Sequence, residues 1–384
     1  MIDIEILNKL NAPTKQERLA NLREVLKTTE FPPMVPQYIN NHIHTTYSFS
    51  PYSPTAAVYA ARMEGLCTAG IIDHDSISGA EEFIEAAKIV DMPVTIGMEA
   101  RVSMDGTRLE GRRTNNPDQV GVSYMTIQSV PHDKINTLTE FFKPYQAARH
   151  ARNRKMLAKI NELVGVELDY DRDVLPLSMA QENGGVTERH LMYALALCLE
   201  KQVGRGQPMI EKLTAMGMSL SEKQKTLLMD TEYPFYAYDV LGMLKGTFVP
   251  KIFIDATDEC PKLSDMVKLC KEVDAYLCYA YLGDVGDSVT GDKKAQKFED
   301  DYLDDVFECL KEEGVKAVTY MPTRNTLAQL ERLRGLCDAY GMFQISGEDI
   351  NTPRQSFVIK AMENPMFQNL IDATWKLIEH EKNT

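Results

Sequence analysis

The chain has 384 residues, of which 44% are hydrophobic and 26% are charged, and its formal net charge is −14. This length exceeds the usual size of one domain, although an α/β barrel with insertions fits within it. The acidic charge argues against a protein that coats nucleic acid, because such affinity comes from lysine and arginine neutralising phosphates. A small phosphorylated ligand or a nucleotide end, held by local arginines, remains compatible with it.

The composition also bears on location. No apolar run reaches the roughly 18 residues of a membrane-spanning helix, and residues 1–5 lack the basic and apolar regions of a signal peptide. The seven cysteines are scattered without a CxxC pair, a pattern typical of reduced thiols in a core. We therefore expect a cytoplasmic protein with no membrane partner and no extended nucleic-acid surface.

The chain begins with a predicted helical extension over residues 1–36. Thr14 and Glu17 have the spacing of a capping box before an amphipathic run that ends near Thr29, and prolines follow at 32, 33 and 36. From residue 37 strands and helices alternate. Strands are expected near 38–44, 68–73, 93–102 and 121–129, and helices near 54–65 and 78–90. Ser78 and Glu81 form a second capping-box spacing. The alternation predicts parallel strands joined by crossover helices.

Strand signals nearly vanish in residues 134–245, which we interpret as a helical insertion. The alternation then resumes, with strands near 275–281, 315–320 and 342–346 and helices near 262–273, 298–313 and 326–340. The seven strands predict an α/β protein with a distorted seven-stranded (β/α)7 barrel, similar to a TIM barrel, formed by residues 37–133 and 246–355. A C-terminal helix is expected within 356–384. The active site of such a barrel lies at the carboxyl ends of the strands.

A pair of histidines two residues apart ends the first predicted strand. His42 and His44 share one face of the strand while Ile43 points to the other, because successive side chains alternate. At the mouth of a barrel such a pair can bind one metal ion jointly. Two solvated histidines are the alternative, so the interpretation depends on further ligands nearby.

Three further strand ends present a possible metal ligand. His74 follows the second strand, and Asp73 beside it can fix the imidazole or contact a neighbouring group. Glu99 ends the third strand, and its carboxylate can bridge two cations. Asp349 comes just after the last strand. Together these residues indicate a divalent metal, and mixed imidazole and carboxylate ligands suit zinc, manganese or iron better than calcium.

Two arginines are candidates for binding phosphate. Arg324 follows the sixth predicted strand and Arg354 the seventh, and the planar fork of a guanidinium can clamp phosphate oxygens. An ordinary surface arginine is the alternative for each. Metal-dependent amidohydrolases also begin with a histidine pair, but they need two more strand-end histidines and usually a bridging lysine, so we rank them below a phosphoesterase.

Four segments, in chain order, resemble the PHP family, the polymerase and histidinol phosphatase superfamily of metal-dependent phosphoesterases: HIHTTYS (42–48), IDHDSISG (72–79), GMEA (97–100) and GEDIN (347–351). Residues 151–166 and 186–191 are similar to the helical insertion of the branch containing nucleoside 3',5'-bisphosphate phosphatases and ribonuclease AM. The resemblance covers residues 38–352. It implies a distorted seven-stranded barrel with up to three metal ions.

The resemblance also implies roles for the candidate ligands. It makes His42, His44, Glu99 and Asp349 the ligands of one metal. Glu99 would bridge to a second metal that His190 also binds, and His74 matches a ligand of the third.

The chain departs from the family pattern at several ligand positions. A ligand after the first motif is replaced by Phe49 and Ser50, a strand-end histidine by residues 279–281, and a strand-four histidine is absent from residues 123–126. The last histidine of the family pattern is replaced by Asn351. We therefore expect Asn351 to lie beside the metal and not to bind it. We therefore expect one or two ions.

The resemblance implies an enzyme that hydrolyses a phosphoester with a metal-activated water. The substrate would be a small phosphomonoester, a nucleotide or a short oligonucleotide, and His74 would act as a general acid if the third metal is lost. The missing ligands motivate an alternative, a catalytically degraded barrel that binds a metal or a phosphorylated ligand as a sensor or scaffold.

Overall fold

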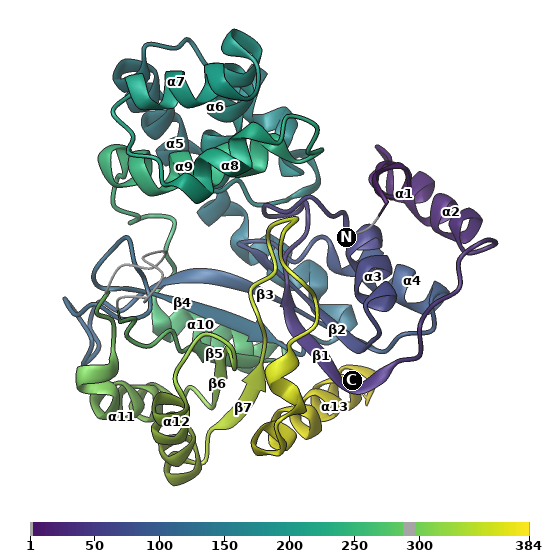
Figure 1. Ribbon diagram of the computed structural model, residues 1–384. Coiled ribbons are helices and arrows are strands. Elements are labelled where there is room, and N and C mark those ends of the chain that lie inside the picture. The colour runs from purple at the N-terminus through teal and green to yellow at the C-terminus, as the bar shows by residue number, and fades with distance from the viewer. Residues whose placement is uncertain (1–2, 287–295, 384) are drawn as a thin grey trace.

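The computed structural model describes residues 3–286 and 296–383. Seven strands form one sheet in which each strand lies beside its neighbours in the sequence (Figure 1), and this confirms the predicted α/β seven-stranded barrel. The strands are β1 (Val35–Ile43), β2 (Leu66–His74), β3 (Val94–Ser103), β4 (Val122–Gln128), β5 (Tyr276–Ala280), β6 (Ala317–Tyr320) and β7 (Phe343–Ser346).

The barrel is nearly closed by a short contact between its first and last strands. The backbone N–H of His44 donates to the carbonyl of Ile350 at 3.0 Å, and the N–H of Ile350 donates to the carbonyl of His42 at 3.2 Å. This parallel bridge forms just after β7. It therefore joins the end of the first strand to the segment that carries Asp349.

Strand direction differs from the prediction at one position. Neighbouring strands are parallel except at β4, which runs antiparallel to both β3 and β5. The expectation of parallel strands was wrong there because residues 104–121, which join β3 to β4, form turns instead of a crossover helix. The end of β4 consequently lies at the opposite end of the barrel from the ends of its neighbours.

The N-terminal extension packs beside the first barrel helices. It contains α1 (Ile4–Leu10) and α2 (Lys15–Val25), and the predicted capping box of Thr14 and Glu17 is present. Buried Arg18 of α2 pairs with Glu82 of α4 (Ala80–Ile89) at 2.5 Å, next to α3 (Pro54–Met63). The capping box predicted at Ser78 is absent, because α4 begins after Gly79 without a side-chain cap.

The helical insertion has a hydrophobic core of its own, which includes Met156, Leu195 and Leu244. It stands above the strands in Figure 1. The insertion begins with α5 as predicted, but α9 continues seven residues beyond the expected boundary at 245. Its helices are α5 (Ile135–Val164), α6 (Glu188–Val203), α7 (Gln207–Ala215), α8 (Glu222–Met229) and α9 (Tyr236–Ile252).

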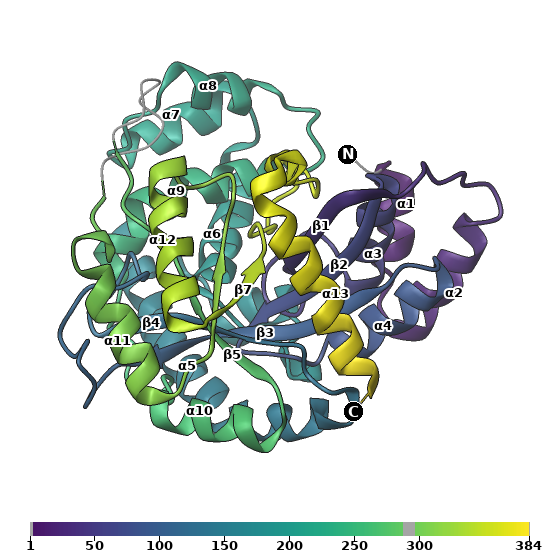
Figure 2. The ribbon, with the colours of Figure 1, turned by 90° about the horizontal axis from the view of Figure 1, so that it is seen from below.

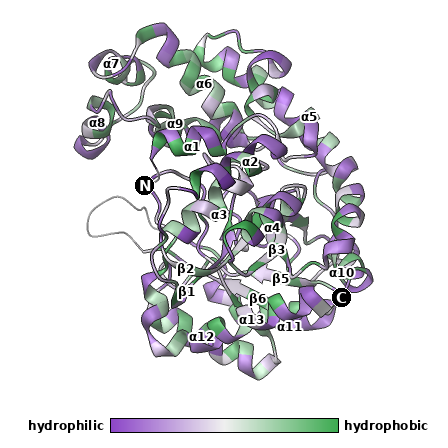
Figure 3. Ribbon diagram, turned by 90° about the vertical axis from the view of Figure 1, so that its right-hand side faces the viewer, coloured by the Kyte–Doolittle hydropathy of each residue, from purple (hydrophilic) through white to green (hydrophobic). Residues whose placement is uncertain are grey.

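The remaining helices cover the outside of the barrel, and α13 crosses it in Figure 2. Buried Glu381 of α13 accepts a hydrogen bond from the backbone N–H of Ile96 in β3 at 3.0 Å. Hydrophilic and hydrophobic residues alternate along the helices in Figure 3, as expected for helices with one face on a core. The described residues contain no helix that is long and apolar enough to cross a membrane. These helices are α10 (Leu263–Glu272), α11 (Leu303–Glu313), α12 (Leu327–Tyr340) and α13 (Gln368–Asn383).

The packing of β3 against its neighbours yields the first prediction. A Cβ atom at Gly97 would lie 2.1 Å from the carbonyl oxygen of Ile127 and 2.7 Å from Cδ1 of Ile72. We expect Gly97→Ala to lower the free energy of unfolding by about 3 kcal/mol, because backbone must move to relieve the overlap. Urea unfolding measures the change. Gly242→Ala in α9, where the added Cβ meets no atom within 4 Å, is the control and should be neutral or stabilising by up to about 1 kcal/mol.

Candidate metal centre

The histidine pair lies where β1 meets the segment after β7. His42 is 7% exposed and His44 1% exposed, and their ring centroids are 5.0 Å apart. Gly347 permits this approach, since a Cβ there would lie 2.6 Å from Cβ of His42. Nε2 of His44 is 3.0 Å from Oδ1 of Asp349. The nitrogen and oxygen ligand atoms of His42, His44 and Asp349 lie within 4.8 Å of one another.

Hydrogen bonds orient His44 for metal binding. Asp73 accepts hydrogen bonds from the Ser48 hydroxyl at 2.5 Å and from the Thr45 N–H at 2.7 Å. Because the Ser48 hydroxyl donates its proton to Asp73, its oxygen accepts a hydrogen bond from Nδ1–H of His44 at 3.1 Å. Nε2 of His44 then faces Asp349 and is the nitrogen that would bind a metal ion. Asp73 therefore acts on His44 through Ser48. This is the second of the two roles that the sequence allowed, contact with a neighbouring group, and not the fixing of His74.

The ends of β2 and β3 complete the cluster. Nδ1 of His74 lies 3.0 Å from Oε2 of Glu99, and Nε2 of His42 lies 3.8 Å from the same oxygen. The pairing of the two strands places His74 directly beside Glu99. The ring of His74 also stacks on His44 with centroids 4.6 Å apart. Ligand atoms of His44, His74 and Glu99 form a second group within 4.8 Å.

The cluster combines imidazoles with carboxylates, which suits a cation. In the ion-free arrangement burial acts to lower the pKa of His44, but the charge of Asp349 outweighs it and the pKa is raised. Burial lowers the pKa of His42, and burial together with the charges of His44 and Arg149 lowers the pKa of His74 well below its usual value. Burial raises the pKa of Glu99. Nε2 of His42 is buried without a hydrogen-bond partner among the described residues. Neutral imidazole is the form that binds metal, so this orphaned nitrogen and the nearby carboxylates fit a divalent ion.

The role of His190 at a second metal site stays a prediction, and in the ion-free structure this histidine has another contact. It lies in neither group of candidate ligands. Its Nδ1 accepts the backbone N–H of Thr187 at 3.0 Å, as the cap of α6. Burial lowers the pKa of His190 to about 3, so the ring is neutral and carries its proton on Nε2. That nitrogen then has no lone pair for a metal.

The aromatic ring of Phe49 packs against His190. The two rings meet edge to face with centroids 4.9 Å apart, and Phe49 also contacts Tyr193 and Tyr238. Phe49 is 4% exposed. An apolar ring thus stands where the family pattern places a metal ligand.

A cavity of about 380 Å³ opens in front of the cluster and is lined by His42, His74, Glu99 and Asp349. Asn351 also lines it and donates a hydrogen bond from Nδ2 to Oδ1 of Asp349 at 2.5 Å, the position beside a ligand that the sequence suggested.

The two predicted phosphate-binding arginines have different surroundings. Arg324 lines the cavity and donates from Nε to the carbonyl of Leu282 at 3.0 Å. Arg354 does not line it. Its guanidinium pairs with Asp239 at 2.7 Å and lies 3.9 Å above the ring of Tyr233. Arg354 thus ties the segment after β7 to the insertion, and its charge is already balanced.

Sequence reasoning missed two cations of the cavity, Arg189 of α6 and Lys245 of α9. Neither follows a strand of the barrel. They reach the cavity only because the insertion folds over the strand ends, and no local pattern in the sequence indicates this.

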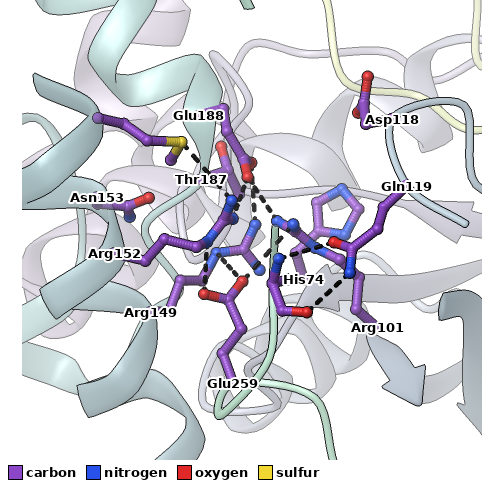
Figure 4. A network of polar contacts seen from close by, with 12 residues as sticks. His74, Arg101, Asp118, Gln119, Arg149, Arg152, Asn153, Thr187, Glu188 and Glu259 are labelled. Atoms are coloured by element: carbon purple, nitrogen blue, oxygen red, sulfur yellow. Dashed lines mark hydrogen bonds and ion pairs between the residues drawn. The ribbon is translucent and has the colours of Figure 1, made fainter. Parts of the chain in front are cut away.

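A buried network of ion pairs behind the cluster joins the insertion to the strand ends (Figure 4), and the sequence did not predict it. Glu188, at the start of α6, pairs with Arg101 of β3 at 2.7 Å, with Arg149 of α5 at 3.1 Å and with Arg152 of α5. Arg152 pairs in addition with Glu259 at 2.6 Å.

The same network reaches the residue that follows His74. Arg149 pairs with Asp75, whose φ is +54°. The backbone N–H of Asp75 donates to the carbonyl of Glu99 at 2.7 Å. The insertion is therefore fixed to the strand ends that carry two of the candidate ligands.

The chain is similar to known proteins over most of this barrel. The PHP domain profile matches residues 40–315. Error-prone DNA polymerases of Mycobacterium bovis and Mycobacterium tuberculosis are 33% identical over 96 residues, which is 24% of this chain and 8% of each polymerase. The chain thus spans less than a tenth of the length of these relatives.

Two solved structures share the fold. A protein described as a metal-dependent phosphoesterase from Bifidobacterium adolescentis has a TM-score of 0.55 at 16% identity, over 88% of this chain and 98% of that one. An amidohydrolase from Chromobacterium violaceum, solved with bound sulfate and no metal, has a TM-score of 0.56 at 15% identity, over 88% of this chain and 96% of that one. The chain therefore shares the fold of these two proteins over most of its length.

The cluster predicts measurable metal binding. We expect the purified chain to bind at least one equivalent of manganese, zinc or iron. His44→Ala should weaken that binding by at least about 100-fold, because losing even a hydrogen-bond partner of a ligand typically costs about 10- to 100-fold. Titration calorimetry and elemental analysis measure both effects. His132→Ala is the control, since His132 faces Glu381 of α13; equal metal binding by both variants would exclude His44 as a ligand.

A buried carboxyl group below the cavity predicts a pH dependence of stability. Burial raises the pKa of Glu299 to about 7, although its Oε1 accepts the N–H groups of Leu282 and Gly283. Between its usual value of 4.5 and 7 the folded state keeps a proton that the unfolded state has released. Stability should therefore fall across this range by on the order of 3 kcal/mol.

Glu299→Gln should remove that slope, because glutamine mimics the protonated carboxyl group. Urea unfolding should find the variant more stable than the parent chain at pH 8 and equally stable at pH 4. Glu272→Gln, at an exposed position of α10, is the control and should leave the slope unchanged. A parent chain without the slope would refute the prediction.

Proposed function

The chain belongs to the PHP domain family, and from that premise we propose that it hydrolyses a small phosphomonoester with the help of one or two divalent metal ions. One observation carries the proposal. Candidate ligands from three strand ends and from the segment after β7 converge on one cluster at the cavity, although they are far apart in the sequence. They are His42, His44, His74, Glu99 and Asp349.

The metal would be held by His42, His44 and Asp349, with Glu99 able to share it or a second ion with His74. When bound, a divalent ion neutralises phosphoryl charge and lowers the pKa of water, the two contributions that phosphoester hydrolysis needs most. The protein contributes orientation. Ser48 holds His44 by Nδ1, and Asn351 holds one oxygen of Asp349.

Two further residues have roles toward the substrate. Arg324 lines the cavity with its Nη atoms free of carboxylate partners among the described residues, so it is placed to bind phosphoryl oxygens. His74 is neutral in the metal-free arrangement and contacts Glu99. This favours a ligand or hydrogen-bonding role, and its action as a general acid stays a prediction.

The size and charge of the cavity favour a small substrate over a polymer. A volume of about 380 Å³ is at the lower end of the range for ligand pockets, about 300–1,000 Å³. The net charge of −14 repels a polyanion. All seven cysteines are free thiols, as expected for the cytoplasmic location that we propose.

Phe49 and His190 favour the alternative, a barrel that binds metal or a phosphorylated ligand without turnover. Phe49 stands at a ligand position of the family pattern, and Nδ1 of His190 accepts the N–H of Thr187, whereas hydrolysis of phosphoesters commonly uses an ion on each side of the phosphorus. Metal binding with no turnover of any phosphoester would support this sensor or scaffold.

Hydrolysis is tested on a panel of phosphate monoesters, with a diester for comparison. We expect the manganese-loaded chain to release phosphate from p-nitrophenyl phosphate, glycerol phosphate or nucleoside monophosphates, and Glu99→Gln to lower kcat/KM by at least about 100-fold. His132→Ala should retain full activity. Failure of the loaded chain on the whole panel, or full activity of Glu99→Gln, would refute the proposal.

A further inference from the structure

Three cations line the cavity beside the candidate metal ligands, and they come from three separate elements. Arg189 is on α6, Lys245 is on α9, and Arg324 lies between β6 and α12. We call them the cation set. Two of the three belong to the helical insertion, so the insertion supplies most of the positive charge of a cavity whose candidate ligands come from the barrel.

The cation set lacks the carboxylate partners that other basic residues of this acidic chain have. No carboxylate of the described residues lies within 4.0 Å of any of the three, whereas the buried arginines of the network behind the cluster are all paired. Among the described residues Arg189 donates to the carbonyl of Asn351, at 3.3 Å, and its buried Nε finds no partner there. Cations left unpaired at a cavity are typical of a binding site for an anion.

The position of Arg189 is fixed before any ligand binds. Its guanidinium lies 5.0 Å from the centre of the Phe49 ring, and the preceding residue, Glu188, is held by the three arginines of the network. A cation placed in this way loses little freedom on binding, so its contribution to affinity is retained.

The number of cations exceeds what the reacting phosphoryl group requires. The charge of that group would already be neutralised by a metal held at His42, His44 and Asp349. Asp349 is also a negative charge that acts on all three cations, and a bound metal would compensate it. Apart from the candidate ligands, exposed Asp118 is the one carboxylate among the described residues that line the cavity.

We infer that Arg189 and Lys245 of the insertion bind a second acidic group of the substrate, beside the phosphoryl group that Arg324 would bind. The substrate would thus be a small phosphomonoester that also carries a carboxylate or a second phosphate. This inference rests on the proposed function, and it assigns specificity to the insertion and chemistry to the barrel.

Binding of non-hydrolysable phosphonates tests the inference without turnover. Three ligands with a three-carbon chain are titrated into the manganese-loaded chain by calorimetry: propylphosphonate, 3-phosphonopropanoate and propane-1,3-bisphosphonate. We expect the two doubly acidic ligands to bind at least about tenfold more tightly than propylphosphonate, as charge-assisted hydrogen bonds permit. A stronger gain for one of them identifies the second group as carboxylate or phosphate.

Variants of the cavity edge locate the effect. Lys245→Met should lower affinity for the doubly acidic ligands by about tenfold and leave propylphosphonate unchanged, and Lys245→Arg should restore it. Lys251→Met, on the same helix but over the ring of Phe248, is the matched control and should bind like the parent chain. Asp118→Asn should tighten binding of the doubly acidic ligands.

Two results would overturn the inference: equal affinity for all three ligands, or a loss in Lys245→Met that is the same for propylphosphonate. The second result would mean that Lys245 binds the reacting phosphoryl group. Because these ligands are not hydrolysed, the outcome is separate from that of the hydrolysis panel, whose failure would refute the proposed function. Thermal unfolding of each variant confirms that it is folded.

Discussion

The candidate centre depends on a buried group of ion pairs that fastens the helical insertion to the barrel. Glu188 alone pairs with three arginines, one from β3 and two from α5. Charges buried in this way need every partner, because an unpaired one costs several kcal/mol. Arg149 extends the network to Asp75, next to His74. The cavity is therefore built by two parts of the chain whose relative position is set by electrostatics as well as by apolar packing.

Much of the barrel could be predicted from the sequence because its signals are local. Alternation of apolar residues indicated all seven strands, and ligands at strand ends indicated one cluster, since neighbouring strand ends meet. The direction of β4 could not be predicted, because periodicity carries no direction and residues 104–121 gave no helix signal. The surroundings of Lys245 and Arg354 could not be predicted either, for another reason. Whether a basic side chain faces a cavity or a carboxylate such as Asp239 depends on how distant segments pack.

A motif identifies a residue type at a position, but a hydrogen bond decides what that residue can do. His44 and His190 both match histidines of the family pattern. Nδ1 of His44 donates to Ser48, which leaves Nε2 available, whereas Nδ1 of His190 accepts from Thr187, which places the proton on Nε2. The replacement of a ligand by Phe49 agrees with this difference. The two histidines therefore differ in which ring nitrogen is free, although both match the family pattern.

An acidic protein that acts on anions must concentrate its positive field, because its surface as a whole repels them. Here most buried arginines are neutralised within the network, and three cations at one cavity have no carboxylate partner in the described parts of the chain. Field lines from such a set are focused by the walls of the cavity. A small anion can approach them, whereas a long polyanion also meets the negative surface outside. Selectivity for size thus follows from the contrast between the net charge of −14 and the local charge of the cavity, in addition to the shape of the cavity.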